Sequence, residues 1–222
     1  MGEIVFLLLS IICIGLIFVA HKYFGKEEFY FLAVIYAVVA FVMSFKTIQI
    51  LGVNVNANVI FDTGIIFILY YFVNRYNYKD SKKLMLTVLI CVLITSMFLI
   101  TTSIMVPSLY DRFSISYQNM LLDSLPIIII YPISLLITMI LSGYCFRELK
   151  EEKSSRFIKM LFTVIGIAFI ETCIFVYFSY AILIDFRKAL LIALDCCLVK
   201  IILMVVFVML TNKIFKVKKV KQ

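Results

Sequence analysis

The chain has 222 residues, of which 64% are hydrophobic and only 15% are charged, and its mean hydropathy is +1.13. Soluble domains carry roughly 45–50% apolar and about 25% charged residues, so this composition excludes a water-soluble globular protein. The formal net charge of +8 would suit nucleic-acid binding. Because the basic residues gather in alternate loops, where membrane topology accounts for them, we expect the lipid bilayer as partner and no nucleic acid.

The apolar residues form continuous runs of about the 20 residues that a membrane-spanning helix needs. A membrane β-strand would instead alternate in polarity over about ten residues. The sequence therefore predicts an all-α polytopic membrane protein: a single transmembrane domain over residues 1–222, built as a bundle of about seven helices. The expected spans are 4–21, 28–45, 57–74, 84–106, 125–146, 157–183 and 188–212. A polar outer turn, Gly52 to Asn58, precedes the third span.

Loop charges predict the orientation, since cytoplasmic loops carry the excess of Lys and Arg. With seven spans, most of the 21 basic residues fall on one side, in the loops around 22–26, 75–83 and 147–156 and in the tail after 212. The opposite side receives only Lys46, Arg112, Arg187 and Lys188. We therefore expect a multi-pass protein of the bacterial plasma membrane with its N-terminus outside and its C-terminus in the cytoplasm.

Motifs for catalysis or metal binding are missing from the sequence. The six cysteines lie in apolar segments without a CxxC pair, where cysteine behaves as a small hydrophobe. Neither a phosphate-binding GxxxxGK[ST] loop nor an HExxH motif occurs. Residues 151–156 fit the EExxxR pattern of intramembrane proteases, but that chemistry needs further histidines and the chain has only His21. We expect no enzyme activity, no metal and no cofactor.

Four charged residues stand out away from the ends of the predicted spans: Asp62, Glu171, Asp195 and Lys200. Such residues usually mark a function or a partner, because a charge in the bilayer is costly. Glu171 and Lys200 lie near the middle of the last two spans, which are antiparallel neighbours, so we expect them to form an ion pair. Asp195 is about 140° away from Lys200 around its helix. Asp62 lies only a few residues into its span from the outside, so a functional role and simple wetting by the headgroup region are both open. A purely structural pair that fixes helix register is the alternative.

Several segments carry a family resemblance. They are Phe45-Lys46-Thr47 with Leu51-Gly52-Val53, Asn58-Val59-Ile60-Phe61, the basic turn Tyr76 to Lys83, Phe146 to Lys150, Glu171-Thr172-Cys173-Ile174-Phe175 and Val199-Lys200. Over nearly the whole chain they resemble the corresponding motifs of the queuosine-precursor transporters, also called the vitamin uptake transporter family. The run from Glu171 to Phe175, in the sixth predicted span, is similar to the family's DT-x-x-F motif.

The resemblance implies import of a small planar heterocycle, such as a 7-deazaguanine-type base. It implies that Glu171, Thr172, Lys200 and Asn58 belong to the substrate site, to which we add Asp62 and Asp195 as charged candidates. Aromatic side chains suit such a ligand by stacking, and Tyr70 and Phe175 are the candidates, with packing as their alternative role. The sequence departs from the family where Ser142 replaces an aspartate and Ile127 an arginine.

Three functions remain open at the level of sequence. The chain is a transporter that works alone or with ion coupling, or it is the substrate-capturing subunit of an importer driven by a separate ATPase. The third possibility is a membrane scaffold without transport, which the departures favour. A homo-oligomer is compatible with each of the three.

Overall fold

Helices make up nearly all of the regular structure in the computed structural model, which describes residues 2–23, 25–106, 114–151 and 156–219. The elements run in the order α1 (Gly2–Tyr23), α2 (Lys26–Met43), β1 (Thr47–Ile50), β2 (Val53–Asn56), α3 (Val59–Arg75), α4 (Tyr78–Ile104), α5 (Ser114–Asp123), α6 (Leu125–Glu151), α7 (Arg156–Thr172), the π-helix η1 (Cys173–Tyr177), α8 (Phe178–Leu183) and α9 (Phe186–Lys219).

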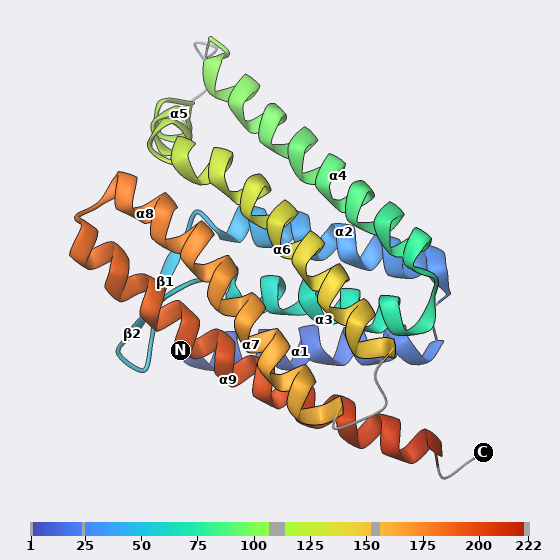
Figure 1. Cartoon of the computed structure of the whole chain (residues 1–222). Helices are drawn as coiled ribbons and strands as arrows, with labels where there is room; N and C mark the ends of the chain where they lie inside the picture. The colour runs from blue at the N-terminus through green and yellow to red at the C-terminus, as the bar shows by residue number, and fades with distance from the viewer. Residues whose placement is uncertain (1, 24, 107–113, 152–155, 220–222) are drawn as a thin grey trace.

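The long helices alternate in direction between two ends of one bundle, so that the chain begins at one end and α9 finishes at the other (Figure 1). Among the described residues, five segments are long and apolar enough to cross a membrane, in α1, α4, α6, α7–α8 and α9. Helices α2 and α3, of 18 and 17 residues, complete the bundle. The prediction of an α-helical membrane bundle of about seven spans is confirmed.

Helix α3 is the centre of the bundle. Every residue from Val59 to Val73 is buried, and the helix packs against α1, α2, α6 and α9. Its close approach to α2 depends on Gly64, where a Cβ atom would lie 2.5 Å from the ring of Tyr36. At 1.5 Å per residue α3 is about 25 Å long. Because protein surrounds it, α3 carries polar residues that a helix facing lipid would exclude.

The segment between α2 and α3 is a β-hairpin, where the sequence predicted only a polar turn. Strands β1 and β2 pair in antiparallel register, with Ile50 opposite Val53. The two turn residues, Leu51 and Gly52, both have positive φ, 51° and 82°, as a tight hairpin turn requires. The hairpin lies at the end of the bundle where α1 begins, since the Leu51 amide donates to a Glu3 carboxylate oxygen at 3.0 Å. We call this end the hairpin end.

The predicted span 157–183 is one pass of three consecutive helical segments. Helix α7 ends at Thr172, the backbone continues as the π-helix η1, and α8 ends at Leu183. Single π-helical turns inside α-helices occur frequently at functional sites, because the inserted residue alters which side chains face inward. Here the π-helical turn begins directly after Glu171 and Thr172, two of the predicted site residues.

Candidate functional site

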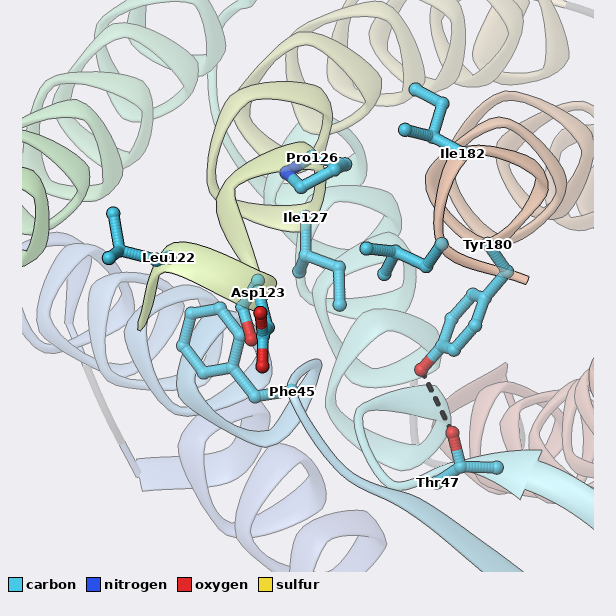
Figure 2. Close-up of a pocket in the computed structure, with 10 residues that line it drawn as sticks. Phe45, Thr47, Leu122, Asp123, Pro126, Ile127, Tyr180 and Ile182 are labelled. Carbon is cyan, nitrogen blue, oxygen red and sulfur yellow. Dashed lines mark hydrogen bonds between the residues drawn. The ribbon is translucent and has the colours of Figure 1, made fainter. Parts of the chain in front are cut away.

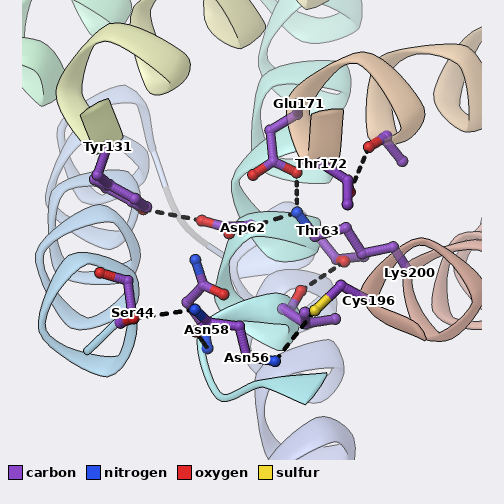
Figure 3. A network of polar contacts seen from close by, with 12 residues as sticks. Ser44, Asn56, Asn58, Asp62, Thr63, Tyr131, Glu171, Thr172, Cys196 and Lys200 are labelled. Atoms are coloured by element: carbon purple, nitrogen blue, oxygen red, sulfur yellow. Dashed lines mark hydrogen bonds and ion pairs between the residues drawn. The ribbon is translucent and has the colours of Figure 1, made fainter. Parts of the chain in front are cut away.

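A cluster of three charged side chains lies inside the bundle (Figure 3). The Lys200 ammonium of α9 forms ion pairs with the Glu171 carboxylate of α7 and with Asp62 Oδ2 of α3, the latter at 3.6 Å. The exposed fractions are 0% for Lys200, 4% for Glu171 and 5% for Asp62. The cluster therefore joins three helices and is closed to solvent.

Tyr131 of α6 brings a fourth helix to the cluster, because its hydroxyl donates to Asp62 Oδ1 at 2.9 Å. The ring of Tyr131 stacks on Phe41 of α2 and meets Phe175 of η1 edge to face, with centroid separations of 5.2 and 5.1 Å. These contacts fix the direction of the phenol. The cluster is thus held by side chains from six segments of the chain, which is a costly arrangement unless the charges are used.

The ion pair predicted between Glu171 and Lys200 is present in the structure. Of the two roles left open for Asp62, wetting by the headgroup region is wrong: α3 is packed inside the bundle, so the side chain is buried and joins the pair. Asp195 stays outside the cluster, as its position on α9 indicated. Its Oδ2 accepts the backbone N–H of Asn54 at 3.0 Å and ties the hairpin to α9.

The other predicted site residues divide into two groups. Asn58 lies one helical turn before Asp62 and is fully buried, and neither polar atom of its side chain has a hydrogen-bond partner among the described residues. Phe175 packs on Tyr131 beside the cluster. The Thr172 hydroxyl instead donates to its own helix at Ala168 O, 2.8 Å away, and Tyr70 packs against Phe146 and Tyr71 farther along α3.

Helix α6 supplies site residues that the sequence analysis did not select. Tyr131, Ser134 and Thr138 are all buried and follow one another at spacings of three and four residues. Residues so spaced share one face of a helix. Such a polar face in an apolar span is a usable signal. Single hydroxyls are common in membrane helices, so each residue taken by itself does not indicate a site.

An open pocket lies at the hairpin end of the bundle (Figure 2). Its volume is about 630 Å³, and it is lined by Phe45, Thr47, Leu122, Asp123, Ser124, Pro126, Ile127, Tyr180, Ile182 and Leu183. The rings of Phe45 and Tyr180 lie on opposite sides of it, and the exposed carboxylate of Asp123 lies beside Phe45. The pocket thus combines two aromatic faces with one acidic group.

Hydrogen bonds tie the hairpin to the wall of this pocket at Thr47 and Tyr180. The Tyr180 hydroxyl lies 2.9 Å from Thr47 Oγ1 and accepts from Asn56 Nδ2 at 2.9 Å. The same Asn56 amide donates to the Ser44 carbonyl at 3.0 Å, and its backbone N–H donates to Cys196 Sγ at 3.2 Å. We call Ser44, Thr47, Asn56 and Tyr180 the hairpin latch. The latch joins the hairpin to both α2 and α8.

Comparison with family models, with curated proteins and with solved structures gives no significant match.

Proposed function

We propose that this membrane protein is a transporter that imports a small planar heterocycle, with a 7-deazaguanine-type base such as a queuosine precursor as the specific candidate. The observation that carries the proposal is the buried cluster of Asp62, Glu171 and Lys200, together with a pocket that opens at one end of the bundle. Charged groups inside membrane bundles commonly border substrate or ion paths. The resemblance to the queuosine-precursor transporters supports the substrate class.

The chemistry of the pocket suits such a base. Small-molecule sites usually measure about 300–1,000 Å³ and combine apolar walls with a few polar groups, which agrees with a volume of about 630 Å³. Phe45 and Tyr180 line the pocket, and aromatic side chains suit a flat ring by stacking. The Asp123 carboxylate is an acceptor for the ring N–H and amino donors of a guanine-type edge, because charged acceptors form the stronger hydrogen bonds.

The hairpin latch is the element that would open a path from the pocket to the charged cluster. It holds the hairpin against the end of α2 and against α8 through a few hydrogen bonds, each worth about 0.5–1.5 kcal/mol net, so its opening costs little compared with moving a helix. Transport by alternating access needs such an element on each side of a central site. The predicted orientation places the pocket on the outside, which agrees with import.

Uptake into proteoliposomes tests the proposal. The purified chain is reconstituted alone, and entry of a radiolabelled 7-deazaguanine base is followed against unlabelled base and against an unrelated sugar. Saturable uptake that only the base competes for supports the proposal. Binding of the base without uptake would indicate the substrate-capturing subunit of an ATP-driven importer, for which an ATPase should co-purify from native membranes. If the chain neither binds nor takes up any planar heterocycle, the remaining function is a membrane scaffold without transport.

A further inference from the structure

A small cavity lies directly against the charged cluster. It is lined by Asp62, Ile65 and Ile66 of α3, by Tyr131, Ser134, Leu135 and Thr138 of α6, and by Glu171 of α7. Its volume is about 10 Å³, which is about the space that one water molecule requires. It is therefore too small for an organic substrate and large enough for a single water or a small ion.

Three of the polar oxygens around this cavity lack a hydrogen-bond partner in the part of the chain that the structure describes, although one of them, Asp62 Oδ2, is ion-paired with Lys200. Asp62 Oδ2, Ser134 Oγ and Thr138 Oγ1 are buried, and none has a hydrogen-bond partner among the described residues. The exposed fractions of Ser134 and Thr138 are 1% and 4%. Native proteins rarely leave buried hydroxyls unpartnered, because each costs about 1–3 kcal/mol. Three such oxygens around one cavity, beside the Glu171 carboxylate, point to a ligand that is bound by oxygen atoms.

Charge decides which kind of ligand fits. The cluster holds two carboxylates, Asp62 and Glu171, but only one ammonium, Lys200. Its formal charge is −1 when all three are ionised, and a lone buried charge is strongly unfavourable. One monovalent cation makes the site neutral, whereas a divalent cation would leave an excess positive charge. Hard cations of this kind prefer carboxylate and hydroxyl oxygens.

We propose that this cavity is a Na⁺ site, in which the ion is bound by Asp62, Glu171 and the hydroxyls of Ser134 and Thr138. Na⁺ occupies about as much space as a water molecule, and K⁺ needs a larger shell than this cavity offers. The ion joins α3, α6 and α7 at the point where the π-helix begins. That Na⁺ drives uptake rests on the proposed function; that Na⁺ binds does not.

The test uses the full chain purified in detergent, without any transport substrate. Its melting temperature is followed as NaCl replaces choline chloride at constant ionic strength, with KCl as the matched salt. We expect a saturable rise of about 3–6 °C at a Na⁺ concentration roughly ten times the Kd, and little change with K⁺. Equilibrium dialysis with radioactive Na⁺ should give one bound ion per chain.

Variants of α6 locate the site. Ser134→Ala and Thr138→Val should abolish the Na⁺-dependent shift, whereas Thr138→Ser, which keeps the hydroxyl, should retain it. Ser142→Ala is the matched control, because Ser142 is equally buried and unpartnered but does not line the cavity. It should retain the full shift.

Three results would overturn the proposal. The first is a wild-type shift that is equal for Na⁺ and K⁺, and the second is a shift that persists in both Ser134→Ala and Thr138→Val. The third is the absence of Na⁺ binding to the wild type in the dialysis experiment. This measurement does not depend on the folding of any variant, and its failure would leave one water molecule and a proton as the occupants of the cavity. A failure of base uptake with intact Na⁺ binding would contradict the proposed function and not this site.

Discussion

Replacing Lys200 with methionine removes the single positive charge of the buried cluster while keeping a flexible apolar side chain of similar length. The Asp62 and Glu171 carboxylates then lie near each other without a cation. Glu171→Gln acts differently, because Lys200 still has Asp62 within 3.6 Å and the cluster becomes neutral. We therefore expect Lys200→Met to destabilise the protein more than Glu171→Gln does.

The size of the effect follows from the burial of the charges. Breaking a buried ion pair by removing one partner typically costs about 3–5 kcal/mol, since the remaining charge is left unpaired. For a chain of this length, 1 kcal/mol shifts the melting temperature by roughly 2–4 °C. Lys200→Met should thus melt about 6–20 °C below the wild type. A triple variant with Asp62→Asn, Glu171→Gln and Lys200→Met removes every charge and should recover much of this loss.

The measurement is thermal unfolding of the detergent-purified variants, monitored by size-exclusion fluorescence. Lys188→Met is the matched control, because it is the same substitution on the same helix at an exposed position, and its melting temperature should change by no more than a degree or two. If Lys200→Met melts with the wild type, or if Glu171→Gln is the more damaging change, the reasoning from the three-charge cluster is wrong. Uptake that survives in the triple variant would make the cluster purely structural.

Three further predictions concern the pocket, the latch and the topology. Asp123→Asn should raise the KM for a guanine-type base about tenfold with kcat little changed, because a charged hydrogen bond is worth about 1.5–3 kcal/mol. The control Asp185→Asn, at an exposed position, should leave uptake unchanged. A KM of Asp123→Asn equal to that of the wild type would contradict the role of Asp123. Tyr180→Phe removes two latch hydrogen bonds. In a chain whose other cysteines are replaced by alanine, it should speed the labelling of Cys196 by an impermeant maleimide about tenfold. Unchanged labelling would show that the latch does not control access to Cys196. A reporter fused to the C-terminus should be active only in the cytoplasm, and activity on the outer side would refute the predicted orientation.

The sequence by itself determined the class of fold and one half of the cluster. Continuous apolar runs predict helices in a membrane, because each helix satisfies its own backbone hydrogen bonds there. The depths of Glu171 and Lys200 on two adjacent antiparallel spans were enough to predict their contact, since a short turn fixes which helices are neighbours. These inferences depend on local pattern and on the arithmetic of helical rise.

The tertiary structure decided what local pattern could not. Asp62 is far from Lys200 in the sequence, and its place in the cluster depends on α3 being enclosed by other helices. The hydroxyls of Ser134 and Thr138 look ordinary in α6 and gain meaning only because they face the same cavity as Asp62 and Glu171. The hairpin latch likewise forms because Asn56 reaches Tyr180, more than one hundred residues away. Long-range packing of this kind is set by side-chain shape and burial across the whole bundle, which the periodicity of any single segment does not encode.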